Sequence, residues 1–305
     1  MSSHPSQIAV LDDARLPVTL AILNERHRLG EPLVMVTAYD FPSARAAEAA
    51  GVDLVLVGDS GAMTVLGYPS TIEVTTDEML MLTRAVRRGL RSPLLVADLP
   101  FGSYEESDEQ AVRTAMRFAK EGGADAVKLE RGNETSVARA RAIVQAGIPV
   151  MGHVGLTPQT STALGGYRAQ GRSAGAAARI AGEMLALQRA GCFAIVLEAV
   201  PAAVTEVLMP LIDVPVIGIG AGPATDGQVL VFHDLLGIRE GRGARFVQRY
   251  ADLQDEMDAG VKAYADDVRA RRYPAPEHSY SIDAAELAEL RAELSALSAA
   301  GPTTP

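Results

Sequence analysis

The stretch ADAVKLERG, residues 124–132, places an ammonium group and a carboxylate within an otherwise apolar segment. Its alanine, valine and leucine residues are typical of a buried strand, and Lys128 and Glu130 lie among them. Side chains two residues apart in a strand point to the same face, so both charges project together. A buried charge is costly unless it is paired, bound to a metal or used in a reaction. The pattern therefore predicts a polar site at the end of this strand.

Neighbouring apolar runs also end in acidic residues. Asp59 and Ser60 follow one run, Asp98 closes the next, and Glu130 lies at the end of the third. Neighbouring strands lie about 5 Å apart, so three carboxylates at one rim cannot all stay ionised without a counter-charge. A hard divalent cation supplies that charge, and carboxylate ligands with retained waters suit Mg²⁺. The three acids together predict a Mg²⁺ site, although each one alone is equally well explained as a helix N-cap or a surface charge.

Four further features at the strand ends each have more than one interpretation. Lys128 either pairs with a carboxylate or supplies positive charge to the acid group of a substrate. Glu198 closes the run FAIVLE, where burial favours a raised pKa and a role as general base, and the alternative is a salt-bridged glutamate. His153 is interpreted as a metal ligand, a hydrogen-bond partner of the substrate or a core residue. GIGAG, residues 218–222, either offers N–H groups to an anion or lets a loop pass close to a ligand.

Seven short apolar runs alternate with segments of helical periodicity. The runs are 33–38, 53–58, 93–98, 125–130, 148–153, 193–198 and 214–220. Continuous apolar strands alternating with helices indicate a parallel sheet covered on both faces. With an eighth strand expected near ARFVQRY, residues 244–250, the pattern predicts a closed (β/α)₈ TIM barrel with its chemistry at the C-terminal strand ends. A doubly wound open sheet is the alternative, disfavoured because no strand leads directly into a dinucleotide-binding glycine fingerprint.

Length, composition and charge exclude several classes of protein. The 305 residues, 48% of them apolar, suit one large α/β domain or two smaller ones. The chain has neither a membrane-spanning apolar run nor a secretory signal pattern, so we expect a cytoplasmic protein without a membrane partner. Its single cysteine, Cys192, excludes an intramolecular disulfide and a cysteine-cluster metal site. A net charge of −10 without a basic stripe argues against a nucleic-acid partner.

Two long loops and a C-terminal segment depart from the alternation. Segments 61–75 and 155–173 are rich in glycine and threonine, and long loops in compact domains are usually functional. Segment 283–301 has leucines at helical spacing, which predicts an amphipathic helix that packs on the body or a partner subunit, or else a frayed extension. We therefore expect one barrel domain with an N-terminal helical extension, 1–280, followed by a tail, 281–305.

Nine segments, in one unbroken order over roughly residues 20–280, resemble the 3-methyl-2-oxobutanoate hydroxymethyltransferase (ketopantoate hydroxymethyltransferase) family. They are TAYDFPSARAAEAAGVDLVLVGDS, VTTDEMLMLTRAVRRG, LLVADLPFGSY, AVKLERG, MGHVGLTPQ, GGYRAQGR, IVLEAVP, VIGIGAGPATDGQVLVFHDLLGI and YPAPEHSY. The resemblance implies a Mg²⁺-dependent (β/α)₈ enzyme of pantothenate and coenzyme A biosynthesis, related to the phosphoenolpyruvate mutase and isocitrate lyase enzymes. It also implies a homo-oligomer, usually a decamer. Departures such as Gly61-Ala62 in place of Leu-Gly, and Ala199 in place of Cys, remove no catalytic group.

The resemblance also assigns roles to individual residues. The metal ligands that it implies are Asp59, Asp98 and Glu130. The residues implied to hold the 2-oxo acid substrate are Asp59, Ser60, Asp98 and Lys128. Glu198 is implied to be the catalytic base, and His153 is expected to lie just behind the metal ligands.

The implied reaction transfers a hydroxymethyl group from 5,10-methylenetetrahydrofolate to 3-methyl-2-oxobutanoate and gives 2-dehydropantoate (ketopantoate). The 2-oxo acid would chelate Mg²⁺, Glu198 would remove its C3 proton, and the enolate would attack the one-carbon unit. The alternative enzyme is a Mg²⁺-dependent C–C or P–C lyase or mutase of the same superfamily. Such enzymes typically use a cysteine in a KKCGH-like loop, which this sequence lacks. A catalytically silent barrel is disfavoured because all three acids and Glu198 are present.

Overall fold

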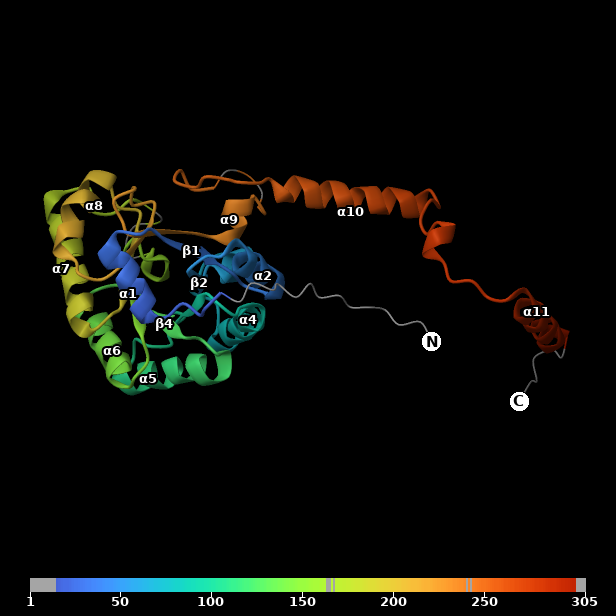
Figure 1. The fold of residues 1–305 in the computed structure, drawn as a ribbon, viewed down its shortest axis with the longest axis horizontal. Coiled ribbons are helices and arrows are strands. Elements are labelled where there is room, and N and C mark those ends of the chain that lie inside the picture. The colour runs from blue at the N-terminus through green and yellow to red at the C-terminus, as the bar shows by residue number, and fades with distance from the viewer. Residues whose placement is uncertain (1–14, 163–165, 167, 240, 242, 300–305) are drawn as a thin grey trace. The chain divides into compact units, whose positions relative to one another are not determined.

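A closed barrel of eight parallel strands forms the centre of the fold (Figure 1). The computed structural model describes residues 15–162, 166, 168–239, 241 and 243–299. The strands follow sequence order around the barrel, and the last pairs with the first. They are β1 (Leu33–Thr37), β2 (Leu54–Val57), β3 (Leu94–Asp98), β4 (Ala126–Lys128), β5 (Val150–Gly155), β6 (Ala194–Glu198), β7 (Val216–Ile219) and β8 (Gly227–Leu230). The predicted (β/α)₈ barrel is confirmed.

Most strands are followed by helices that surround the barrel (Figure 1). α1 (Leu20–Leu29) precedes β1, and the other α-helices of the first unit are α2 (Phe41–Ala50), α3 (Gly61–Thr64), α4 (Thr76–Gly89), α5 (Asp108–Arg117), α6 (Glu134–Gln145), α7 (Ala174–Ala190), α8 (Ala202–Leu208) and α9 (Phe232–Leu236). Local sequence sets their ends, as α4 illustrates. Thr75 accepts a hydrogen bond from the N–H of Glu78, whose carboxylate accepts one from the N–H of Thr75. This capping box satisfies backbone donors that the first helical turn leaves without partners.

Side chains alternate between two hydrophobic layers along each strand. One layer lies between the strands and the outer helices, and the other fills the barrel interior. The interior residues of β3 to β6 include Val96, Ala126, Met151 and Val196. The residues two positions beyond them are Asp98, Lys128, His153 and Glu198. Because strand periodicity is two, these four polar side chains continue the inward-facing rows and reach the C-terminal end of the barrel.

The eighth strand is not the one that the sequence predicted. β8 is Gly227–Leu230, whereas the described residues 244–250 form turns and irregular backbone. The connection from β7 to β8 runs through residues 220–226, which are all described and contain no helix. The expected alternation of strand and helix therefore breaks at this point, and the prediction placed the strand too far along the chain.

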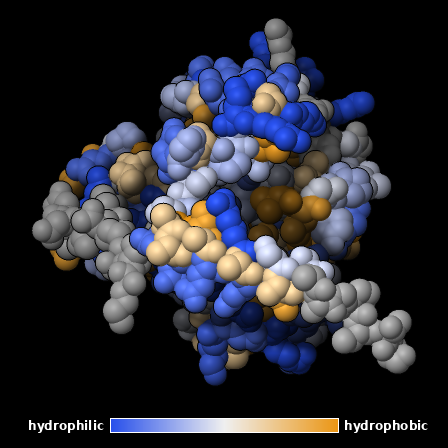
Figure 2. Space-filling model, turned by 90° about the vertical axis from the view of Figure 1, so that its right-hand side faces the viewer, coloured by the Kyte–Doolittle hydropathy of each residue, from blue (hydrophilic) through white to orange (hydrophobic). Residues whose placement is uncertain are grey.

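The chain divides into two compact units, Met1–Ala251 and Asp252–Pro305. The second unit contains α10 (Leu253–Arg269) and α11 (Ala284–Ala299), and α11 confirms the helix predicted within 283–301. The proposed boundary near residue 280 stays a prediction. None of the helices in the described residues is long and apolar enough to cross a membrane. Hydrophilic residues cover most of the face drawn in Figure 2, with smaller hydrophobic areas among them.

Candidate active site

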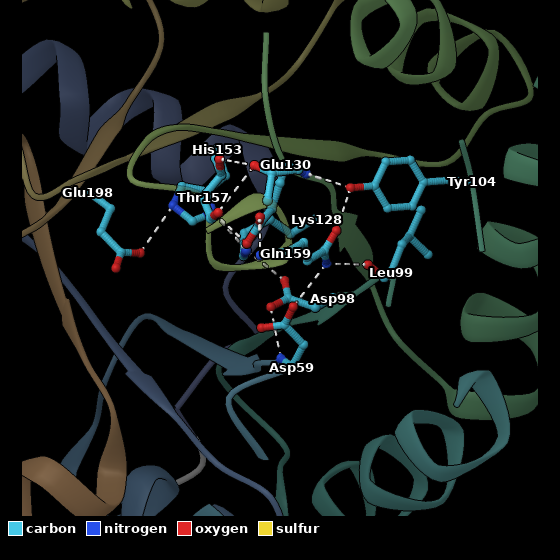
Figure 3. A network of polar contacts seen from close by, with 11 residues as sticks. Asp59, Asp98, Leu99, Tyr104, Lys128, Glu130, His153, Thr157, Gln159 and Glu198 are labelled. Atoms are coloured by element: carbon cyan, nitrogen blue, oxygen red, sulfur yellow. Dashed lines mark hydrogen bonds and ion pairs between the residues drawn. The ribbon is translucent and has the colours of Figure 1, made fainter. Parts of the chain in front are cut away.

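Strands β2 to β5 bring charged side chains to one end of the barrel (Figure 3). Asp59 and Glu130 lie two residues beyond the ends of β2 and β4, and Asp98, Lys128 and His153 lie on the inward-facing rows of β3, β4 and β5. The exposed fractions of the three acids are only 4% for Asp59, 2% for Asp98 and 1% for Glu130. These side chains line a cavity of about 100 Å³, together with Ser60 and Glu198. The structure thus brings all of the predicted site residues to one cavity.

Lys128 is paired with a carboxylate in this structure. Its Nζ lies 2.9 Å from Oδ1 of Asp98, the partner of Lys128 in the β3–β4 register. The other oxygen of Asp98, Oδ2, accepts a hydrogen bond of 3.0 Å from the backbone N–H of Asp59. No hydrogen-bond donor in the described residues is aligned with Oδ1, which therefore has an ion pair but an unfilled acceptor position. Of the two interpretations of Lys128, the pairing with an acid is the one seen here.

The acids outnumber the cations that face them, and their pKa values reflect this. Burial raises the pKa of Asp59, and the negative charges of Asp98 and Glu130 raise it further. Burial also raises the pKa of Asp98, although Lys128 opposes the change. Burial alone would lower the pKa of Lys128, but the three surrounding carboxylates outweigh it and raise this pKa. The cluster is therefore a place where an additional positive charge is stabilised.

His153 connects the acid cluster to Glu198. Its Nδ1 lies 3.4 Å from Oε1 of Glu130 and 3.3 Å from Nζ of Lys128, and its Nε2 lies 3.2 Å from Oε2 of Glu198. Burial and the Lys128 charge lower the pKa of His153, but hydrogen bonds to both glutamates prevail and raise it to about 9. The side chain of Glu198 is 15% exposed, whereas that of His153 is 3% exposed. His153 is thus a buried link between two carboxylates, and Glu198 occupies the more open end.

Gln159, which the sequence reasoning did not single out, ties two of the acids together. Its Nε2 donates to Oδ2 of Asp59 and to the carbonyl oxygen of Leu99, both at 2.9 Å. Its backbone N–H donates to Oε2 of Glu130 at 3.0 Å. Its Oε1 accepts a 2.6 Å hydrogen bond from the Tyr104 hydroxyl, which itself accepts one from the backbone N–H of Glu130. Gln159 and Tyr104 therefore fix the positions of Asp59 and Glu130.

Ser60 lies at the start of α3 and faces the same cavity. Its hydroxyl does not cap the helix, and instead shares a 2.8 Å hydrogen bond with the hydroxyl of Tyr39. Burial raises the pKa of Tyr39 to about 12, so its hydroxyl stays protonated. The Tyr39 hydroxyl holds the side chain of Ser60 in place. Because it does not cap the helix, the Ser60 hydroxyl can also form a hydrogen bond to a ligand in the cavity.

The donor set matches a hard divalent cation in chemistry and charge, because it contains the carboxylates of Asp59, Asp98 and Glu130. One oxygen of Asp98, Oδ1, accepts no hydrogen bond from the part of the chain that the structure describes. As they stand, however, no group of three or more His, Cys, Asp or Glu side chains in the described residues is arranged to hold a metal ion. Gln159 binds one oxygen of Asp59, and Lys128 pairs with one oxygen of Asp98. A cation would therefore bind the other oxygen of Asp59 and displace Lys128 from Asp98 or share that carboxylate with it.

Known proteins resemble this chain in sequence over most of its length. Residues 17–276 match the protein family described as ketopantoate hydroxymethyltransferase. The chain is 53% identical over 266 residues to 3-methyl-2-oxobutanoate hydroxymethyltransferase of Moorella thermoacetica, which covers 87% of this chain and 98% of that protein. It is 48% identical over 286 residues to a protein of Arabidopsis thaliana named 3-methyl-2-oxobutanoate hydroxymethyltransferase 1, mitochondrial, covering 92% of this chain and 82% of the relative.

Solved structures of similar fold come from more distant proteins. One is 2,3-dimethylmalate lyase, described as a member of the PEP mutase/isocitrate lyase superfamily, with a TM-score of 0.56 and 17% identity over 94% of this chain and 100% of that chain. Another is phosphonopyruvate hydrolase in complex with oxalate and Mg²⁺, with a TM-score of 0.55 and 16% identity over 92% of this chain and 96% of the other. These identities show a shared fold and nothing more. The sequence matches go further, and by them the chain belongs to the ketopantoate hydroxymethyltransferase family.

Proposed function

We propose that this chain transfers a hydroxymethyl group from 5,10-methylenetetrahydrofolate to 3-methyl-2-oxobutanoate and forms 2-dehydropantoate (ketopantoate) for pantothenate and coenzyme A biosynthesis. The observation that carries the proposal is the single cavity that three buried acids share with Glu198. Relatives about half identical to this chain bear the name of this activity. The lyase or mutase alternative has weaker support, because proteins with such names resemble this chain at only 14–17% identity.

Asp59, Asp98 and Glu130 are the residues that would hold a Mg²⁺ ion. Carboxylate oxygens are the ligands that this cation prefers, and the repulsion that raises the pKa of Asp59 would be relieved by it. When bound, Mg²⁺ would polarise the ketone of the 2-oxo acid and stabilise negative charge on its oxygen. The Gln159 amide and the Tyr104 hydroxyl keep Asp59 and Glu130 oriented while this charge develops.

Lys128 and Ser60 would position the 2-oxo acid. The Lys128 ammonium is 4% exposed, lines the cavity and keeps its proton, because the surrounding acids raise its pKa. A substrate carboxylate would therefore meet a fixed positive charge in a dry site, where such a contact is stronger than in water. Ser60 follows Asp59 in the sequence, and its hydroxyl, which the Tyr39 hydroxyl holds in place, supplies a neutral hydrogen-bonding group.

Glu198 would remove the C3 proton of the substrate. It faces the same cavity, and His153, whose pKa is raised to about 9, places a positive charge 3.2 Å from its carboxylate. The electron pair of the broken C3–H bond then forms the new C–C bond to the methylene carbon. Both carbon–nitrogen bonds of the donor's methylene carbon break, water supplies the hydroxyl group, and the two released folate nitrogens take up one proton from C3 and one from water.

Proton NMR of purified protein with 3-methyl-2-oxobutanoate, 5,10-methylenetetrahydrofolate and Mg²⁺ tests this function. We expect 2-dehydropantoate to appear with the metal and to disappear with EDTA. A folded protein that binds Mg²⁺ and yet forms no product would overturn the proposal.

By family analogy we also propose a cytoplasmic homo-oligomer, a decamer, without nucleic-acid or membrane partners. Multi-angle light scattering after gel filtration tests the assembly, and a mass other than ten times that of the chain would contradict a decamer.

A further inference from the structure

A second cavity opens beside the polar one. It has a volume of about 900 Å³, which lies within the range of about 300–1,000 Å³ typical of pockets for drug-sized ligands. Its lining residues come from the ends of β5, β6 and β7 and from residues 244–246. Glu198 lines both cavities, so a ligand in the larger one has access to the carboxylate that faces the smaller one.

Small and apolar residues form the walls of this larger cavity. Val200 and Pro201 follow β6, and Phe246 contributes an aromatic ring that is 38% exposed. Gly220 has a φ of 63°, and a Cβ placed there would lie 2.5 Å from the ring of Phe246. A Cβ on Gly222 would lie equally close to the Cβ of Ala202. Gly220 and Gly222 therefore allow Phe246 and Ala202 to approach the backbone closely.

Two arginines, Arg168 and Arg245, lie at the exposed part of the lining. Among the residues that the structure describes, neither guanidinium makes an ion pair or a hydrogen bond. Other arginines are paired, as Arg117 is with Asp77, but exposed ones such as Arg189 also have no partner among the described residues. What distinguishes Arg168 and Arg245 is that both line this cavity. Two uncompensated guanidinium groups beside a cavity, in a chain with a net charge of −10, indicate a ligand with carboxylates or a similar anion.

We propose that this cavity binds the reduced folate, with its glutamate carboxylates at Arg168 and Arg245 and its one-carbon end toward Glu198. The direction follows from exposure, because both arginines are exposed whereas Glu198 is largely buried. A folate carries its charged glutamate at one end and its flat pterin ring at the other, which matches the charged mouth and the apolar walls. The inference rests on the proposed function, since it places the donor of that reaction.

Binding of tetrahydrofolate, which carries no one-carbon unit, tests the assignment without catalysis. Isothermal titration would compare wild type with Arg168→Met and Arg245→Met, which keep an unbranched aliphatic stem and remove the charge. We expect each substitution to weaken binding about tenfold, as the loss of a charge-assisted hydrogen bond predicts. Arg189→Met is the matched control, because Arg189 is exposed on α7 and does not line the cavity. Unchanged affinity in both cavity variants would overturn the proposal.

Tetrahydropteroate, which lacks the glutamate, shows whether the arginines act on that group. We expect Arg168→Met and Arg245→Met to change its affinity by less than about twofold, because the contact that they remove is absent from this ligand. An equal loss with both ligands would contradict the assignment of the arginines to the glutamate carboxylates.

Proton exchange at C3 of 3-methyl-2-oxobutanoate in D₂O, without folate, separates this inference from the proposed function. We expect both arginine variants to exchange this proton within about twofold of wild type, whereas their KM for 5,10-methylenetetrahydrofolate rises about tenfold. Wild-type protein that exchanges the proton but does not bind tetrahydrofolate would overturn the folate site alone. Wild-type protein that neither exchanges the proton nor forms product would overturn the proposed function.

Discussion

Two halves of the barrel rim differ in what their strands deliver. The ends of β2 to β5 supply buried titratable groups in which the acids outnumber the cations, and Gln159 and Tyr104 hold two of these acids. The ends of β6 and β7 supply glycine, alanine and valine around an open cavity of about 900 Å³. Glu198, on β6, is the residue that the two regions share.

This difference separates two physical tasks. Fixed charges in a dry, enclosed site stabilise developing charge without reorganising, which requires burial and a complete hydrogen-bond network. A large ligand that must enter and leave requires the opposite, namely small side chains and open walls. Glu198 lies where both requirements meet, and His153 connects it to the charged half. The predictions below test whether the two halves can be altered independently.

Removing the carboxylate at the boundary should have the largest effect. We expect Glu198→Gln to slow C3 proton exchange by roughly 10² to 10⁴-fold, the usual contribution of a general base. Affinities for Mg²⁺ and 3-methyl-2-oxobutanoate should stay near wild type, because the charged half is intact. Deuterium exchange followed by NMR measures the first quantity and calorimetry the others. Glu206→Gln, on the exposed surface of α8, is the control. Undiminished exchange in Glu198→Gln would refute the base assignment.

Removing an acid from the charged half should affect the metal instead. We expect Asp59→Ala to weaken Mg²⁺ binding by more than about a hundredfold, since loss of a direct ligand exceeds the 10- to 100-fold cost of losing a residue behind it. Folding should survive, because burial and neighbouring acids already disfavour ionised Asp59. Calorimetric titration would compare this variant with Asp255→Ala on α10, which is exposed. An unchanged Mg²⁺ affinity would exclude Asp59 from the ligand set.

Gln159 should act on the metal through the acids that it holds. We expect Gln159→Ala to lower Mg²⁺ affinity about tenfold, because Asp59 loses the donor that orients it. Tyr104→Phe should act in the same direction but less, since it removes only the hydroxyl that binds Gln159 and the backbone of Glu130. Tighter binding in Gln159→Ala would mean that the amide competes with the metal for Asp59, and would reverse this interpretation.

Seven of the eight barrel strands could be predicted from the sequence, and the eighth could not. Strands buried on both faces are continuous apolar runs, so all seven predicted runs overlap an observed strand. β8 gives no such run, because its residues GQVL include a glycine and a glutamine. Its register depends on pairing with β1 and β7, contacts that join distant parts of the chain and leave no local pattern.

The same distinction separates the predicted site residues from the missed ones. Lys128 and Glu130 could be predicted to project together because residues two apart in a strand point to the same face, and both line the cavity. Gln159 lies in a single 3₁₀ turn, Pro158–Thr160, which is too short to give a periodic pattern, and it binds Asp59, which is 100 positions away in the chain. The motif MGHVGLTPQ contains this glutamine, but a neutral amide gives no electrostatic signal until the fold places acids around it. Arg168 and Arg245 are likewise brought to one cavity by the fold alone.

The smallest expected effect is on the pH dependence of the stability of the protein, and it comes from His153, which links the two halves. The pKa of His153 is about 9 in the folded protein and 6.5 ordinarily, so folding favours its protonated form. This contribution is complete below about pH 6.5 and is lost as the pH rises through 9. We expect the Tm of the metal-free protein to fall by a few degrees over this interval, and by less in His153→Gln.

Asp59 and Asp98, whose pKa values are raised, also favour folding at lower pH, so the difference between wild type and His153→Gln is the quantity that isolates the imidazole. Differential scanning calorimetry in EDTA at several pH values measures it. Parallel pH profiles for the two proteins would mean that His153 is neutral in the fold, with Nδ1 accepting from Lys128 rather than donating to Glu130. In that case the charged half would not extend to Glu198.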